Sequence, residues 1–257
     1  MRILRKLSAR PQPPEYVLIE TTGLADPAPV AQTFFVDEEV KAAYRLDAIV
    51  TLVDAAHAAR HLDEEKPAGV ENEAVEQVAF ADRIILNKTD LVSGEALAAL
   101  EAQLRRINAF APLVRAAHAD VPIDGVLGLG AFDLARTLAA DADFLDTSGT
   151  HEHDARVGSV GIRAEGDLDL ARVNAWLGGL LRSRGADIFR SKGVLAIAGS
   201  DERFVFQGVH MQLALGSSAD GGPRRWAPGE ARVNRLVFIG RGLDRDELQA
   251  SFEACRA

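Results

Sequence analysis

Short apolar runs alternate with helical patterns in the first half of the chain, and this alternation most constrains the fold. The runs lie at residues 16–19, 46–53 and 84–86. Apolar stretches without polar alternation are typical of strands buried on both faces, as in parallel sheets. Helical spacing of apolar residues occurs at 71–80 and again at 94–107, where Ser93 is a natural N-cap. The pattern predicts an α/β unit with a parallel sheet and right-handed crossovers.

The second half predicts a different architecture, a small α+β domain. Apolar residues three or four apart between 170 and 181 predict a helix that stops at Gly185. Asp244 and Glu247 have the spacing of a capping box, which starts a final helix. Strand patterns lie at 156–164, 193–198, 203–209 with a continuation to 215, and 233–239. This order favours an antiparallel sheet with the helices on one face.

The charge divides unevenly along the chain and supports two units. Residues 1–150 carry 14 basic and 24 acidic side chains, a net charge of −10, whereas residues 151–257 carry 15 and 14, a net charge of +1. We therefore predict a first domain over 1–145, a short histidine-containing linker over 146–155 and a second domain over 156–257.

Composition excludes several classes of function. The net charge of −9 and the pI near 5.2 leave no broad basic field for nucleic acid. The single cysteine, Cys255, cannot form an internal disulfide, and no run approaches the roughly 18 apolar residues of a membrane span. Without an apolar signal segment, we expect a cytoplasmic protein that binds neither nucleic acid nor membrane, and its oligomeric state stays open.

The clearest chemical signal is the tetrapeptide Asn87-Lys88-Thr89-Asp90, directly after the run at 84–86. The Asp90 carboxylate can accept the ring N–H and the exocyclic amine of guanine, donors that adenine lacks in that arrangement. The Asn87 amide can bond the base edge and pin the loop, and the Lys88 stem can cover the base face. Open α/β sheets bind ligands at the ends of such strands. The motif predicts guanine recognition, and the alternative is a polar strand-to-helix turn.

A second signal is the segment 20–27, Glu-Thr-Thr-Gly-Leu-Ala-Asp-Pro. As the end of a strand over 16–19, Glu20 would place its carboxylate at the carboxyl edge of the sheet, where it can hold Mg²⁺ through water beside nucleotide phosphates. Gly23 can offer an unobstructed backbone N–H to a terminal phosphate. Asp26 and the proline after it can cap and start the next helix. The alternative is a capped turn with no catalytic role.

Together these motifs resemble the CobW family of P-loop GTPases, proteins implicated in metal delivery. The resemblance runs over nearly the whole chain from about residue 15. It is carried by residues 16–30, 46–55, 81–91, 190–193, 204–210 and 235–241. It implies an α/β fold, a truncated parallel-sheet P-loop GTPase domain followed by a small α+β C-terminal domain. The implied function is that of a GTP-binding metal chaperone, which couples GTP hydrolysis to delivery of zinc or cobalt.

The resemblance also implies roles for individual residues. Glu20 and Gly23 take catalytic roles, Glu20 as a water-mediated Mg²⁺ ligand and Gly23 as the sensor of the terminal phosphate. Asn87, Lys88 and Asp90 bind the nucleotide base. The implied cofactors are GTP and Mg²⁺, with zinc as a further candidate, and the implied partners are GTP or GDP and a client metalloprotein.

The chain departs from the family pattern in two segments. It contains no Gly-x-x-x-x-Gly-Lys-Ser/Thr phosphate loop and no Cys-x-Cys-Cys metal motif, since its one cysteine is Cys255. We therefore expect a fragment, a wrongly assigned start or a degenerate paralogue, with no useful GTP hydrolysis by the chain as given. The alternative function is a non-catalytic module that binds a client or a metal.

Histidines are the remaining metal candidates. His151 and His153 lie near carboxylates in the predicted linker and could bind zinc weakly, but a closed zinc site usually needs four ligands, so a solvated linker is favoured. His57 and His61 are four residues apart, a spacing more often found at surface or core positions than at metal sites. His210, in a strand-like run, is interpreted as structural.

Overall fold

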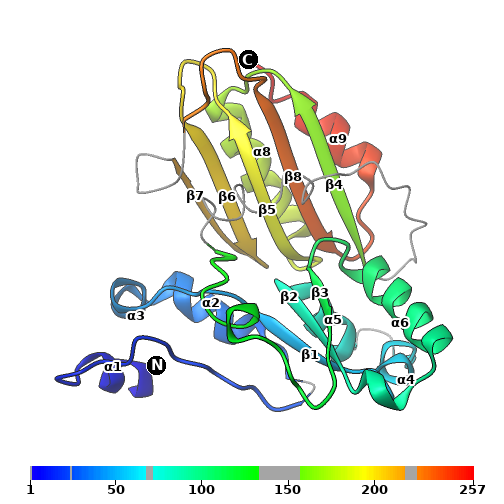
Figure 1. Cartoon of the computed structure of the whole chain (residues 1–257). Coiled ribbons are helices and arrows are strands. Elements are labelled where there is room, and N and C mark those ends of the chain that lie inside the picture. The colour runs from blue at the N-terminus through cyan, green and yellow to red at the C-terminus, as the bar shows by residue number, and fades with distance from the viewer. Residues whose placement is uncertain (1, 24, 68–71, 133–156, 218–224) are drawn as a thin grey trace.

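The computed structural model describes residues 2–23, 25–67, 72–132, 157–217 and 225–257, and these residues form two sheets with their helices. The smaller sheet lies below the larger one in Figure 1. The strands of the smaller sheet are β1 (Val50–Asp54), β2 (Arg83–Asn87) and β3 (Leu113–Arg115). Those of the larger sheet are β4 (Gly158–Glu165), β5 (Ile188–Ala196), β6 (Arg203–Val209), β7 (Gln212–Ser217) and β8 (Val233–Gly240).

The first unit is the predicted parallel α/β fold. Its helices are α1 (Arg2–Ser8), α2 (Ala28–Val36), α3 (Glu38–Ala43), α4 (Ala58–Leu62), α5 (Glu73–Phe80) and α6 (Gly94–Ile107). The strands are parallel in the order β1-β2-β3, so β2 is central. Ile84 and Leu86 of β2 are 1% and 0% exposed and belong to one core cluster with residues of α5 and α6. A strand is therefore confirmed at each of the runs 46–53 and 84–86, although β1 begins only at Val50.

The run at residues 16–19 does not form the predicted strand. It is irregular chain outside both sheets, and Tyr16, Leu18 and Ile19 are 51%, 68% and 48% exposed. A strand buried on both faces needs a paired neighbour and a cover for each face, and the described residues supply neither to this run. β1 is therefore an edge strand of the described parallel sheet, as β3 is on the other side, and Leu52 of β1 is 60% exposed. The strand prediction is wrong because apolar composition favours burial without specifying a pairing partner.

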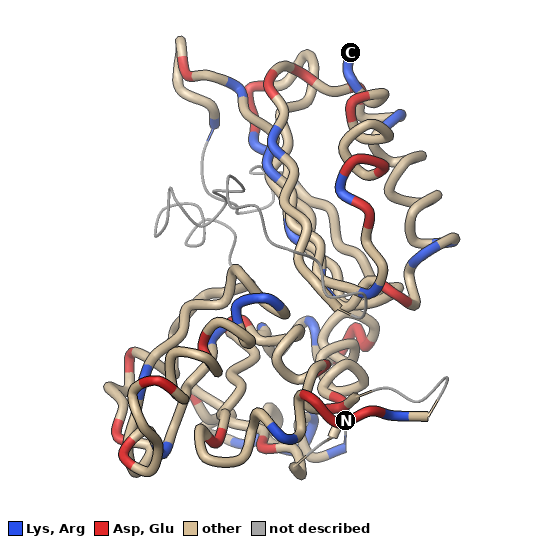
Figure 2. The backbone as a smooth tube through the Cα atoms, turned by 90° about the vertical axis from the view of Figure 1, so that its right-hand side faces the viewer, with Lys and Arg blue, Asp and Glu red and all other residues tan. Residues whose placement is uncertain are grey.

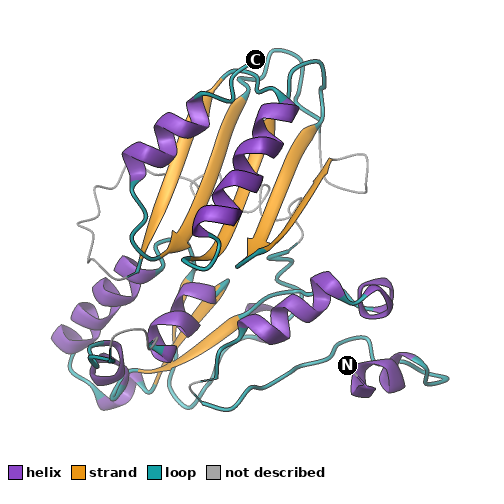
Figure 3. Cartoon of the chain, turned by 180° about the vertical axis from the view of Figure 1, so that it is seen from behind, coloured by secondary structure: helices purple, strands orange, loops and turns teal. Residues whose placement is uncertain are grey.

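The second unit is the predicted α+β domain. Its antiparallel sheet has the order β4-β8-β5-β6-β7, and α8 (Leu170–Arg184) and α9 (Arg245–Glu253) cover one face (Figure 3). The stretch 203–215 divides into β6 and β7 at a turn, where His210 has a φ of 49°. Gly193 of β5 lies against the ring of Phe206 on the neighbouring strand, and a Cβ at this position would collide with that ring. Packing against Phe206 therefore requires a glycine at position 193, the last residue of segment 190–193.

Side-chain caps begin two helices where the sequence predicts them. The Ser93 Oγ accepts the backbone N–H of Ala96 (3.2 Å) at the start of α6. The Asp244 Oδ1 accepts the backbone N–H of Glu247 (2.9 Å) at the start of α9. Both bonds satisfy N–H groups that have no partner inside the helix.

We expect the Ser93→Ala substitution to lower the free energy of unfolding by about 1 kcal/mol, because it removes the cap of α6. Ser93→Asp keeps an acceptor at the same position and should stay within about 0.5 kcal/mol of the wild type. Urea unfolding followed by circular dichroism measures both variants. Equal losses in the two variants would contradict the capping role.

The two units share one apolar core. Phe80 at the end of α5 and Phe189 of β5 have ring centroids 5.9 Å apart, and their cluster also contains Val237 of β8. The His210 ring lies 5.2 Å from the Phe80 ring and 5.5 Å from the Phe189 ring. The structural interpretation of His210 is therefore confirmed, although the residue lies in a turn. The domain limits 1–145 and 156–257 stay predictions, and the linker 146–155 lies outside the described residues.

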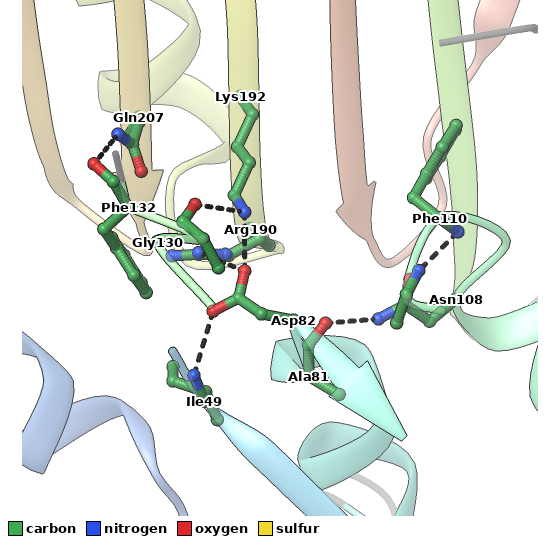
Figure 4. Close-up of polar contacts among 12 residues, drawn as sticks. Ile49, Ala81, Asp82, Asn108, Phe110, Gly130, Phe132, Arg190, Lys192 and Gln207 are labelled. Atoms are coloured by element: carbon green, nitrogen blue, oxygen red, sulfur yellow. Dashed lines mark hydrogen bonds and ion pairs between the residues drawn. The ribbon is translucent and has the colours of Figure 1, made fainter. Parts of the chain in front are cut away.

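A buried ion cluster joins the two units at the start of β2 (Figure 4). Asp82 precedes β2, and its side chain is 2% exposed. Its Oδ1 accepts from Arg190 Nη2 (2.7 Å) and Lys192 Nζ (2.5 Å) of β5, and its Oδ2 accepts the backbone N–H of Ile49 (3.0 Å). Burial alone would raise the pKa of Asp82, but the charges of Arg190 and Lys192 hold it below its usual value. The ionised carboxylate thus ties β5 to the parallel sheet.

Polar and aromatic contacts extend this cluster (Figure 4). Lys192 Nζ also donates to the carbonyl oxygen of Ala131 (2.9 Å), and the Arg190 guanidinium lies 4.0 Å from the centroid of the Phe132 ring. On the other side of Asp82, the buried Asn108 donates from Nδ2 to the carbonyl oxygen of Ala81 (2.9 Å). The segments 81–91 and 190–193, far apart in sequence, therefore meet at one interface.

Figure 2 shows both acidic and basic residues along the backbone of each unit. Within the described ranges, no helix has the length and apolar character needed to cross a bilayer.

Candidate functional site

The Asn87–Asp90 motif lies at the carboxyl edge of the parallel sheet. Asp54 and Asn87 are partners in the register, so β1 and β2 end side by side. Lys88 follows with a left-handed backbone (φ 60°), and the chain then forms a short 3-10 turn, η1 (Thr89–Leu91). The position expected for the motif, directly after a buried strand, is confirmed. Its residues therefore occupy the edge where open α/β sheets bind ligands.

Asn87 and Thr89 tie the loop that follows β3 to the motif. The Asn87 side chain is nearly buried, and its Oδ1 accepts the backbone N–H of Ala119 (2.9 Å). Thr89 makes two bonds to the carbonyl oxygen of Ala116, from Oγ1 (2.9 Å) and from its backbone N–H (3.2 Å). These contacts fix both ends of the loop 116–119, so Asn87 pins a loop as the sequence predicts.

The loop 116–119 is a part of the site that the sequence analysis missed. His118 and Ala119 have φ values of 54° and 55°, which are uncommon for residues other than glycine. Such backbone conformations occur often at binding sites. The loop follows β3, whose three residues are too few to give an apolar run. The sequence could still have indicated this loop, because loops that follow neighbouring parallel strands meet at one edge of the sheet.

Asp90 is exposed beside this loop. Among the residues that the structure describes, its carboxylate has no hydrogen-bonding or ionic partner. An ionised carboxylate is an acceptor at both oxygens, so Asp90 can take two donors from a ligand. Contact between Asp90 and a guanine base stays a prediction.

Lys88 is held by Asp54 at the end of β1. Lys88 Nζ donates to Asp54 Oδ2 (2.7 Å), and His57 Nδ1 lies 3.1 Å from the same oxygen. The Asp54 Oδ1 accepts the backbone N–H of Ala56 (2.9 Å). The hydrogen bond from Lys88 is the main cause that lowers the pKa of Asp54 to about 2, so this carboxylate is ionised at neutral pH. Sequence analysis did not include Asp54 in the site, although it directly follows the run at 46–53.

Glu20 and Gly23 do not lie at the end of a strand. Both residues are exposed, and within the described residues no hydrogen bond or ion pair joins either one to the Asn87–Asp90 motif. The prediction that Glu20 ends a strand is wrong, because the run before it is unpaired. Asp26 accepts the backbone N–H of Ala28 (2.8 Å) at the start of α2, as expected. The catalytic roles of Glu20 and Gly23 stay predictions.

The described histidines are not grouped with enough other ligands to hold a metal ion. His151 and His153 lie outside the described residues. His57 is the N-cap position of α4 and contacts Asp54, whereas His61 lies exposed on α4. In the described part of the chain, no three or more histidine, cysteine, aspartate or glutamate side chains are grouped so that they could hold a metal ion.

The fold and the motif define a protein of two units, a parallel α/β unit of the nucleotide-binding type and an α+β unit packed on it. The chain belongs to the CobW family. A family model described as "CobW/HypB/UreG, nucleotide-binding domain" matches residues 1–115. A second, described as "Cobalamin synthesis protein cobW C-terminal domain", matches residues 157–256.

Curated relatives and a solved structure agree with this assignment. The chain is 34% identical over 240 residues to the zinc chaperone YjiA of Escherichia coli, covering 93% of this chain and 70% of YjiA. It is 33% identical to the zinc chaperone CobW of Pseudomonas aeruginosa (95% and 67% covered) and 29% identical to the zinc-regulated GTPase metalloprotein activator 1 of Saccharomyces cerevisiae (91% and 61% covered). The Zn(II)-bound YjiA GTPase from E. coli superposes with a TM-score of 0.74 at 31% identity, covering 91% of this chain and 69% of that one.

Proposed function

We propose that this chain is a metal chaperone of the CobW type that binds GTP through its guanine base and serves zinc delivery to a client metalloprotein. The coupling of GTP hydrolysis to metal delivery is proposed for the full-length family, because this sequence contains no phosphate loop. The observation that carries the proposal is the exposed, unpartnered Asp90 carboxylate beside Asn87 and the pinned loop 116–119. Two relatives named zinc chaperones and one named a zinc-regulated GTPase support the metal and the nucleotide. A cytoplasmic location stays a prediction.

The described residues fit one part of GTP better than the others. Asp90, Asn87 and Lys88 supply the acceptors and the aliphatic cover that a guanine base needs. Glu20 is a single exposed carboxylate, and Mg²⁺ commonly takes one or two carboxylates together with waters and phosphates. Zinc finds no grouped ligands in the described part of the chain. Among the described residues, the base is therefore the part of GTP for which Asp90, Asn87 and Lys88 supply matching groups.

Nucleotide titration of the 257-residue chain tests this proposal. We expect GMP, GDP and GTP to bind within about threefold of one another, because the sequence contains no phosphate loop to distinguish them. Two or three hydrogen bonds to the base, each worth about 0.5–3 kcal/mol, are partly offset by the cost of ordering the ligand. The dissociation constant should therefore lie near 1 mM, which corresponds to about −4 kcal/mol. Calorimetry or NMR titration measures the affinities, with AMP as the control.

The alternative, a non-catalytic module that binds a client or metal, makes a different prediction for the same titration. Such a module needs no base selectivity, so GMP and AMP would give equal responses. Micromolar GTP binding with Mg²⁺-dependent phosphate release would instead show a phosphate site beyond the residues named above.

A further inference from the structure

We infer that Asp54 is a positioning residue for the guanine site: its carboxylate anchors the Lys88 ammonium, so that the lysine stem is already in place beside the base. The inference rests on the proposed function. The inference adds Asp54 to the site. This residue lies outside the motif, 34 positions before Lys88, at the end of the neighbouring strand β1.

Asp54 is itself held firmly enough to act as an anchor. Its Oδ1 accepts the backbone N–H of Ala56 (2.9 Å). Its Oδ2 accepts from Lys88 Nζ (2.7 Å), and His57 Nδ1 lies 3.1 Å from the same oxygen. The backbone beside it is also fixed to the motif, since the N–H of Ala55 donates to the carbonyl oxygen of Asn87 (2.9 Å). The carboxylate, the turn after β1 and the start of the motif therefore form one connected unit.

The exposure of this ion pair indicates a role in orientation. The side chains of Lys88 and Asp54 are 47% and 32% exposed. Ion pairs this exposed contribute little to folding stability. Lysine nevertheless loses much rotamer freedom when a ligand immobilises it, and an anchor that removes this freedom beforehand favours binding. With the ammonium held by Asp54, the part of Lys88 that remains to contact a base is its aliphatic stem.

The same contact has an opposite interpretation, in which Asp54 competes with the ligand for Lys88. The two interpretations differ in the sign of one measurement. If Asp54 positions Lys88, the Asp54→Asn substitution weakens nucleotide binding. If Asp54 competes, the same substitution strengthens it. The anchored carboxylate and the stem-only contact favour positioning.

The test is an NMR titration of the full 257-residue chain with GMP, and with AMP as the reference. We expect Asp54→Asn to weaken GMP binding about three- to tenfold, the cost of immobilising one long side chain. Its melting temperature should stay within about 2 °C of the wild type, since the pair is exposed. Asp54→Glu keeps the charge and should recover part of the affinity. Asp63→Asn is the matched control: Asp63 is an exposed acid whose side chain accepts from Gln103 Nε2 of α6 (2.6 Å).

A double substitution shows whether Asp54 acts through Lys88. In a Lys88→Ala background, Asp54→Asn should cause no further loss of GMP affinity. Unchanged or tighter GMP binding by Asp54→Asn, or a loss that persists in the Lys88→Ala background, overturns the inference while the guanine site stands. A wild-type chain that binds GMP no better than AMP overturns the proposed function, and the inference with it.

Discussion

Replacement of Asp82 by alanine is expected to lower the free energy of unfolding by about 3–5 kcal/mol, because it leaves the buried Arg190 guanidinium without a counter-charge. It also favours loss of the proton from Lys192, whose pKa burial already lowers to about 8. The side chains of Arg190 and Lys192 are only 4% and 11% exposed, and both donate to the same oxygen of Asp82. Urea unfolding followed by fluorescence and circular dichroism measures the loss.

The loss of unfolding free energy in Asp82→Ala depends on the buried charge that is left unpaired. A combined variant separates this cost of unpaired charge from the cost of lost packing. Asp82→Leu with Arg190→Met and Lys192→Met removes all three charges and should be within about 1–2 kcal/mol of the wild type, since buried ion clusters can often be replaced by apolar side chains at little cost. A loss below about 1 kcal/mol for Asp82→Ala would contradict the buried cluster. Equal losses for the single and the combined variants would show that packing dominates.

The same cluster makes the folding stability depend on pH in the acid range. The pKa of Asp82 in the folded chain is held below 3.8, its usual value, so the carboxylate adds stability that is fully present above that value. This stability is lost as the pH falls from 3.8 through the folded-state pKa. Comparison of acid unfolding between the wild type and the combined variant should therefore show a shallower acid transition in the variant.

Features that depend on nearby residues were predictable from the sequence. The central strand β2, the caps at Ser93 and Asp244, and the helix that ends at Gly185 each follow from residues within a few positions of one another. The Asn87–Asp90 motif belongs to the same class, because its position after a buried strand is set by local sequence. The division into a parallel and an antiparallel unit follows from the order of such local signals.

Contacts between distant residues were not predictable in this way. The Lys88–Asp54 pair joins residues 34 positions apart, and the Asp82–Lys192 pair joins residues 110 positions apart. A charged residue in isolation gives no signal of its partner, so each of these side chains resembles a solvated one in the sequence. The unpaired run at 16–19 is the converse case, because its apolar residues indicate a strand while the described chain supplies no neighbour to pair with it. Pairing is a property of the whole sheet.

Asp90→Asn is expected to abolish the preference of the site for guanine and to transfer it to xanthine. The Asp90 carboxylate presents two acceptors to the ring N–H and the exocyclic amine of guanine, whereas an amide presents one acceptor and one donor. Xanthine carries a carbonyl oxygen in place of that amine and therefore matches the amide. Loss of a hydrogen bond to a charged group costs about 1.5–3 kcal/mol, which corresponds to a roughly 10- to 100-fold weaker affinity for GMP.

NMR titration of wild type and Asp90→Asn with GMP and with xanthosine monophosphate measures this exchange of preference. Folding stability should not change, because Asp90 is exposed and has no partner within the described residues. Asp124→Asn, at an exposed acid of η2 (Ile123–Gly125), is the control for the change of one charge. If Asp90→Asn binds GMP as the wild type does, the base does not contact Asp90, and the Asn87–Asp90 segment is a polar turn. If GMP affinity falls and xanthosine monophosphate affinity rises together, the carboxylate itself selects the base, since the substitution alters only the pattern of donors and acceptors at one side chain.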